Sequence, residues 1–281
     1  MLVLVALLAT MNIGIKTLTK NGISGAEILL LRSSCNLLAA FSIAGFTKTS
    51  IIPKQPKLQF GTFMCSGLSL LLVFTAYQYI SAGSVSTLQR LDIPLLVLVA
   101  AFNKKSNLLQ ISLSLLAFVL VAALIVFSKT TNEHPIGYFI VLAAVVIICI
   151  NTLLQKKIAL TENIPTIIFI SSISSVFWSG IQCMQTHATF ANIHTGILLV
   201  IIGLSIINLI IFYIINDIYK KYNPEVVRYP YLVAAFFTMI VEMVIAQKLS
   251  SPVLIIGNIS ILVVLTLLVR SRQIKNITEI S

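Results

Sequence analysis

Long apolar stretches alternate with short polar ones along the whole chain. Windows of about 18 or more apolar residues recur from end to end, which is the length that a transmembrane helix needs. Open strands cannot cross lipid because their backbone groups would go unpaired, and the short alternating segments of a membrane β-barrel do not appear. The pattern predicts an all-α integral membrane protein with ten spans, near residues 2–19, 24–47, 58–80, 84–102, 107–128, 135–155, 164–185, 195–218, 223–246 and 252–269.

Composition agrees with this class. The chain has 281 residues, of which 58% are hydrophobic and 10% charged, whereas soluble domains carry about 25% charged residues. No stretch between the predicted spans is long enough to fold as a soluble domain. The first apolar segment, MLVLVALLATMNIGIK, lacks the basic lead-in of a signal peptide, so we interpret it as the first span.

The net charge of +11 would fit a nucleic-acid partner, but its distribution favours a lipid bilayer. If the N-terminus lies inside, only Lys20, Lys129 and Lys248 fall in the outer turns. Basic residues gather on the cytoplasmic side of membrane proteins. We therefore predict no nucleic-acid binding and a multi-pass protein of the cell (inner) membrane with both termini cytoplasmic. The predicted inner turns and tail hold Lys48, Lys54, Lys57, Lys104, Lys105, Lys156, Lys157, Lys220, Lys221, Arg270, Arg272 and Lys275.

The ten spans divide into two sets of five, in residues 1–130 and 131–281 of a single membrane domain. Transporter folds often arise by such duplication. Because five is odd, the second half must cross the membrane in the opposite sense, which predicts two inverted five-helix repeats. Matching residues recur at a nearly constant offset: Pro94 and Pro230 are 136 apart, Tyr77 and Tyr213 are 136 apart, and Asn12 and Asn151 are 139 apart.

The stretch STLQRLDIP places Arg90, Asp92 and Pro94 within five residues at the head of an apolar run. A charge at bilayer depth is costly, and Pro94 removes a backbone donor. Arg90 and Asp92 are two residues apart and point to different faces of a regular helix, so each needs a partner on another helix or contact with water. Pro94 also frees the carbonyl of Arg90, and such a broken turn is tolerated only against protein or a wet cavity.

Seven residues are therefore candidates for a central cavity that binds a small molecule. Their charges are mainly positive, which favours a carboxylate or phosphate on the substrate, while the tyrosines and the aspartate would suit an amino-acid-like or nucleoside-like metabolite. The competing interpretation is that the charges form interhelical ion pairs that fix packing. The candidates are Lys16, Tyr77, Arg90, Asp92, Tyr213, Arg228 and Tyr229.

The chain resembles the drug/metabolite transporter superfamily in its EamA-type ten-helix branch. The resemblance rests on NIGIKTL with Lys16, on EILLLRSSCNLLAA with Arg32, and on the two proline-bearing spans. It implies a secondary transporter whose central cavity opens alternately to each side; an exporter of drugs or metabolites is the alternative within the same fold. The family's glutamates after spans four and nine are missing, since NKKSN and AQKLS stand there.

Two other classes remain as alternatives, a membrane-embedded enzyme and a channel. An enzyme would need a clustered catalytic set, and Asp92 and Asp217 are isolated in the sequence. The four cysteines and three histidines show no ligand spacing, so we predict no metal, no cofactor and no enzymatic activity. The expected partners are a small-molecule substrate and the lipid bilayer, and the expected state is a monomer or homodimer.

Overall fold

Helices form almost wherever the apolar pattern predicts them, and the all-α class is confirmed for the described part of the chain, which contains no strand. The structure is a computed structural model that describes residues 2–102, 106–127, 133–191, 193–221, 227–246 and 252–278. Its helices are α1 (Leu2–Lys20), α2 (Gly25–Thr47), α3 (Pro56–Ala76), α4 (Ala82–Gln89), α5 (Asp92–Phe102), α6 (Leu108–Phe127), α7 (Pro135–Thr161), α8 (Ile164–Gln185), α9 (Thr195–Lys221), α11 (Tyr229–Ala246) and α12 (Pro252–Thr278).

Local sequence explains where most of these helices begin. Proline occupies one of the first two positions of α3, α7 and α8, where its missing N–H has no helical partner to lose. The start of α2 carries a capping box, in which the Ser24 hydroxyl accepts from the Glu27 N–H and the Glu27 carboxylate accepts from the Ser24 N–H. These ends match the predicted ones to within a few residues.

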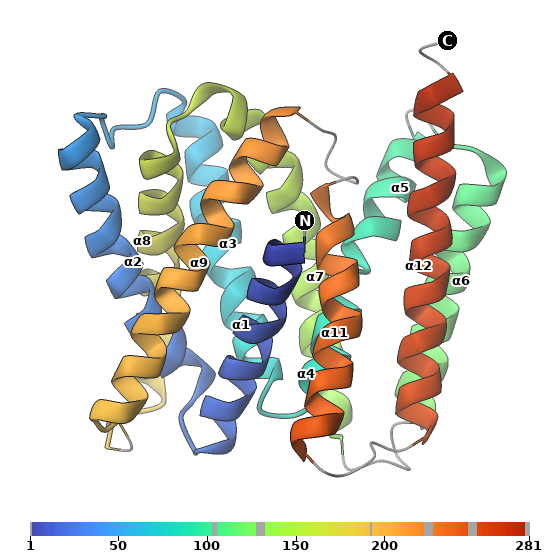
Figure 1. The fold of residues 1–281 in the computed structure, drawn as a ribbon, viewed down its shortest axis with the longest axis horizontal. Coiled ribbons are helices and arrows are strands. Elements are labelled where there is room, and N and C mark those ends of the chain that lie inside the picture. The colour runs from blue at the N-terminus through green and yellow to red at the C-terminus, as the bar shows by residue number, and fades with distance from the viewer. Residues whose placement is uncertain are drawn as a thin grey trace.

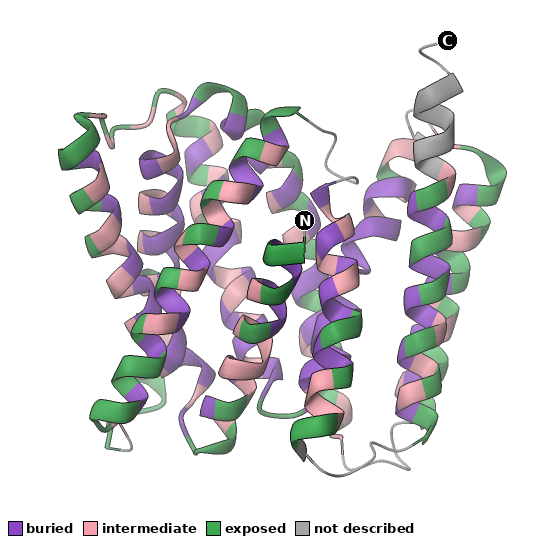
Figure 2. Cartoon of the chain, in the orientation of Figure 1, coloured by how far each residue is buried: buried purple, intermediate pink, exposed green. Residues whose placement is uncertain are grey.

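The helices run up and down in one bundle (Figure 1). In that view α2, α8, α3 and α9 form the left side, α5, α6 and α12 the right side, and α1, α7, α4 and α11 the middle. Buried residues face the interior of the bundle and exposed ones its surface (Figure 2). Helices α3 and α8 approach closely at Gly67, where a Cβ would lie 2.3 Å from the Ser174 carbonyl oxygen. Small residues allow such contacts between membrane helices.

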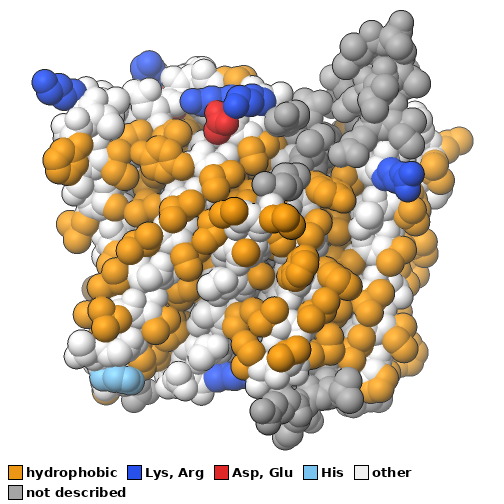
Figure 3. Space-filling view, viewed as in Figure 1, with side chains coloured by type: hydrophobic (Ala, Val, Ile, Leu, Met, Phe, Trp, Pro, Cys, Tyr) orange, Lys and Arg blue, Asp and Glu red, His pale blue; other side chains and the backbone are white. Residues whose placement is uncertain are grey.

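The surface of the bundle is apolar. Phe46, Leu108 and Leu2 are among its most exposed side chains, at 89%, 83% and 79%. On the face drawn in Figure 3, hydrophobic side chains cover the middle and most of the visible Lys and Arg lie along the upper rim. Such an extensive apolar surface is stable in contact with lipid, whereas its contact with water would be unfavourable. This is the architecture of a multi-pass membrane protein.

Nine helical segments of the described residues are long and apolar enough to cross a membrane. One of them, Ala82–Ala101, is the predicted fourth span, and it is divided into α4 and α5. The predicted ninth span, 223–246, corresponds in part to α11, which is shorter than the other membrane helices. Residues 222–226 lie outside the described residues. The tenth span and the inverted repeat therefore stay predictions.

Candidate functional site

The division between α4 and α5 lies at Arg90 and Leu91. Because Pro94 has no N–H to offer, the carbonyl of Arg90 accepts instead from the Ile93 N–H at 3.0 Å. The N–H groups of Arg90 and Leu91 likewise bond three residues back, at 3.1 and 3.0 Å, so the chain tightens locally into a 3₁₀ turn. The broken turn expected from the sequence is present, and it presents Arg90 and Asp92 inside the bundle.

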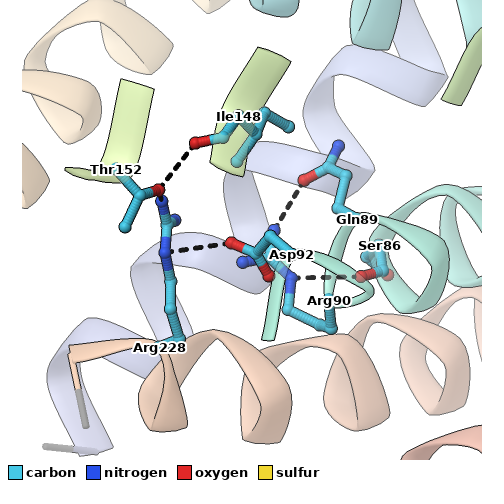
Figure 4. Close-up of polar contacts among 7 residues, drawn as sticks. All are labelled: Ser86, Gln89, Arg90, Asp92, Ile148, Thr152 and Arg228. Carbon is cyan, nitrogen blue, oxygen red and sulfur yellow. Dashed lines mark hydrogen bonds and ion pairs between the residues drawn. The ribbon is translucent and has the colours of Figure 1, made fainter. Parts of the chain in front are cut away.

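Asp92 and Arg228 form an ion pair across the bundle. The Asp92 Oδ2 lies 3.0 Å from the Arg228 Nε, and the carboxylate is completely buried. The geometry is that of an ion pair and not of a linear hydrogen bond. Arg228 also donates through Nη2 to the Thr152 hydroxyl, which in turn donates to the Ile148 carbonyl at 2.7 Å (Figure 4). The partner of Asp92 therefore comes from another helix, as the two-residue spacing from Arg90 predicts.

Arg90 lies beside this pair without an acidic partner of its own. Its Nε donates to the Ser86 carbonyl at 3.3 Å and its Nη2 to the Gln89 side chain at 2.7 Å. The Nη1 atom is buried and has no hydrogen-bond partner within the described part of the chain. Arg90 is 5% exposed. Asp92 attracts Arg90 as well as Arg228, so two buried guanidinium groups share one carboxylate and a net positive charge remains, which is costly in an apolar bundle.

The ring of Tyr231 joins the two arginines. The guanidinium carbon of Arg90 lies 4.7 Å from the ring centroid and that of Arg228 lies 5.2 Å from it. Both distances are within the range of cation–π attraction. Tyr231 is three residues after Arg228 and so lies on the same face of the helix. The sequence contains this spacing, although it does not show that Arg90 also meets Tyr231.

Beside these residues is a cavity of about 190 Å³. Helices α1, α3, α7, α8 and α9 line it, together with the end of α4 and the start of α11. Of the described residues that line it, none is acidic, and the two cations are Arg90 and Arg228. The uncharged polar groups of the lining are those of Asn12, Ser66, Ser69, Tyr77, Gln89, Asn151, Gln155, Ser171, Asn208, Asn216, Tyr219 and Tyr231.

The structure places the seven predicted candidates in different environments. Tyr77, Arg90 and Arg228 line the cavity, and the Tyr77 hydroxyl donates to the Asn12 side chain at 3.0 Å. Asp92 lies behind the lining as the partner of Arg228. Tyr213 is 38% exposed and Tyr229 is partly buried against the hydrophobic core, and neither lines the cavity.

Lys16 also lies outside the cavity lining, one helical turn beyond Asn12. Its Nζ donates to the carbonyls of Tyr77 and Ile80, at 2.6 and 2.7 Å, where α3 ends. Cationic side chains commonly satisfy the free carbonyls of a helix C-terminus. Lys16 therefore connects α1 to the turn between α3 and α4.

Two carboxylates accept hydrogen bonds from backbone N–H groups at the start of α4. Glu242 accepts from the N–H groups of Ala82 and Gly83, at 3.1 and 2.8 Å. Glu133 accepts from the Ser81 N–H at 2.8 Å. Acceptors at a helix N-terminus satisfy donors that the helix leaves free. Sequence reasoning did not find this arrangement, because its residues come from α11, from the segment before α7 and from α4.

Chemically, the arrangement can hold a ligand by charge and hydrogen bonds. Within the described ranges, no three His, Cys, Asp or Glu side chains gather as metal ligands would. The four cysteines are unpaired thiols on α2, α3, α7 and α8.

No family model and no curated protein matches the chain. Among solved structures, 16 chains match. One of them, described only as the crystal structure of a protein, has a TM-score of 0.68 and 14% sequence identity, and the match covers 96% of this chain and 96% of that one. At this identity the likeness concerns the fold, and it extends over nearly the whole chain.

Proposed function

We propose that the protein is a secondary transporter of the EamA type, which moves a small polar metabolite across the membrane by alternating access. The observation that carries the proposal is the cavity. Helices of both halves wrap it, with Asn12, Tyr77 and Arg90 from the first half and Asn151 and Arg228 from the second. Sites between two repeats, next to interrupted helices, are typical of secondary transporters.

Packing of the helices is consistent with two inverted repeats. If α2 is the counterpart of α8 and α6 of α12, each pair should meet across the axis that relates the halves, and α2 packs on α8 and α6 on α12. Pro94 and Pro230 each lie in the first turn of a helix, α5 and α11. Asn12 and Asn151 both line the cavity. Tyr77 and Tyr213 do not share an environment.

In the transport cycle, the contacts of Lys16, Glu133 and Glu242 would form the gate that closes the cavity on one side of the membrane. They are hydrogen bonds between side chains and the backbone at helix ends. Breaking them would let α1 and α11 move away from α4 and admit a substrate from that side. Such a gate is the element that alternating access requires.

The proposal is tested by counterflow into liposomes that contain the purified full-length protein. We expect saturable uptake of a labelled amino acid, nucleoside or organic acid, accelerated by the same unlabelled compound inside. Protein-free liposomes are the control. Uptake that rises linearly with concentration would identify a channel, and a chemically altered compound would identify an enzyme. Either result contradicts the proposal.

We further propose that both termini lie in the cytoplasm, because the inner turns hold most of the lysines and arginines. A cysteine in place of Ser50 or Lys157 should then react with an impermeant thiol reagent only after permeabilisation. One in place of Asn21 or His187 should react in intact cells. All four side chains are exposed at the ends of the bundle. The parent for these variants has its native cysteines replaced, and the reverse labelling pattern would contradict the orientation.

A further inference from the structure

The charges around the cavity do not balance within the described residues. Arg90 and Arg228 line it, and the acidic residue nearest to them is Asp92, which forms an ion pair with Arg228. This leaves one positive charge without a partner, on a side chain that is 5% exposed. The Nη1 atom of Arg90 also lacks a hydrogen-bond acceptor in the described part of the chain. An unsatisfied charge in an apolar interior marks a functional position.

We propose that Arg90 and Arg228, whose guanidinium groups both contact the Tyr231 ring, bind the carboxylate group of a small organic monoanion. The inference rests on the proposed transport function and names the substrate class of that same cavity. A guanidinium is planar and presents its N–H groups as a fork that matches a carboxylate. Arg90 and Arg228 both line the cavity, so a carboxylate inside it would be attracted by both guanidinium groups. Tyr231 holds the two guanidinium groups on its ring.

Charge selects a monoanion over other ligands. One carboxylate neutralises the single unmatched cation, whereas a phosphate group with its charge of about −1.5 to −2 at pH 7 would leave excess negative charge in the bundle. A cationic or zwitterionic ligand would need an acid for its ammonium group. None of the described lining residues supplies one, because Asp92 is fully buried behind the lining with Arg228.

Size limits the rest of the molecule. The volume of about 190 Å³ is somewhat larger than the roughly 150 Å³ of a protein cavity that takes up benzene. The carboxylate therefore carries a remainder about as large as a six-membered ring. Phe74 and Ile148 offer apolar contacts to that remainder, and Asn12 and Asn151 offer amide groups.

Thermal unfolding of the detergent-solubilised full-length protein tests this site without any transport. The probes are three compounds of similar shape: benzoate, which is anionic, benzamide, which is neutral, and benzylamine, which is cationic. A ligand that binds only the folded state raises the unfolding temperature. We expect millimolar benzoate to raise it at constant ionic strength, and benzamide, benzylamine and inorganic phosphate to leave it unchanged. An equal shift with benzamide or a larger one with phosphate would overturn the inference.

Substitutions of the arginines test whether the stabilisation by benzoate depends on Arg90. Arg90→Gln should weaken benzoate binding at least about tenfold, and Arg90→Lys, which keeps the charge but loses the fork, should weaken it less. Arg32→Gln is the matched control, because Arg32 is also a buried arginine whose Nε has no hydrogen-bond partner in the described part of the chain, but it does not line the cavity. It should change benzoate binding by no more than a few fold. A benzoate shift that survives Arg90→Gln unchanged overturns the assignment.

Failure of this inference is distinguishable from failure of the transport proposal. Suppose that benzoate does not stabilise the protein but a neutral or cationic compound shows saturable counterflow. That outcome contradicts the anion site and supports the transport proposal. A benzoate shift that depends on Arg90, in a protein that gives no counterflow, supports the anion site and contradicts transport.

Discussion

Replacing Arg228 by Gln is expected to destabilise the protein by about 3–5 kcal/mol, because the Asp92 carboxylate is then buried without its counter-charge. Within the described residues, the Asp92 oxygens have no hydrogen-bond donor besides this ion pair. Asp92→Asn should cost less, since the Arg228 side chain is 11% exposed, borders the cavity and keeps its contacts with Thr152 and Tyr231. Thermal unfolding in detergent measures both effects.

The double variant Asp92→Asn/Arg228→Gln is the decisive member of this cycle. Removing both charges leaves neither member of this pair buried without the other, so most of the lost stability should return. Lys221→Gln is the control, because it breaks an ion pair with Asp217 whose side chains are 63% and 59% exposed. Exposed pairs contribute about 0–1 kcal/mol. If the double variant is as unstable as Arg228→Gln alone, the pair is not the reason that Arg228 stabilises the fold.

Replacing Arg90 by Gln is expected to have the opposite signature, a loss of uptake with no loss of stability. Uptake into liposomes of a substrate that the wild-type protein transports should fall at least about tenfold, which corresponds to 1.4 kcal/mol of binding or transition-state free energy. The physical reason is that Asp92 keeps its ion pair with Arg228 when Arg90 is removed, so no acid is left buried without a partner. Its removal relieves the burial of a charge and sacrifices two hydrogen bonds and the contact with Tyr231.

Unfolding temperature and uptake must be measured on the same preparations of Arg90→Gln. An unfolding temperature at or above that of the wild type, together with lost uptake, is the pattern of a site that sacrifices stability for function. Arg32→Gln should retain uptake, because that guanidinium is outside the cavity lining. An Arg90→Gln protein that transports normally, or one as unstable as Arg228→Gln, would assign Arg90 to packing.

Some intramembrane charges of this protein bind backbone groups at helix ends. Lys16 was a candidate for the binding site, and the structure places its ammonium group on carbonyl oxygens at the end of α3. Glu242 satisfies the opposite kind of group, the free N–H groups at the start of α4. Charges in a membrane bundle can thus compensate helix ends as well as bind ligands.

The sequence by itself determined the elements of this protein and one feature of the site. Apolar length predicted the helices, because a segment that crosses lipid needs about 20 apolar residues in a row. Pro94 likewise predicted the broken turn at Arg90, and the two-residue spacing predicted that Asp92 pairs elsewhere. These consequences are local, so a linear sequence contains them.

Only the tertiary structure decided which residues meet. Asp92 pairs with Arg228, 136 residues away, and the Tyr231 ring contacts both arginines while Tyr213 is 38% exposed at the surface of the bundle. The repeat offset linked Tyr213 to Tyr77 and did not identify Tyr231. Contacts between helices depend on the rotation and crossing of each helix, which many side chains set together. A spacing along one helix fixes which of its residues share a face, but the neighbour that covers that face is chosen by the packing of the whole bundle.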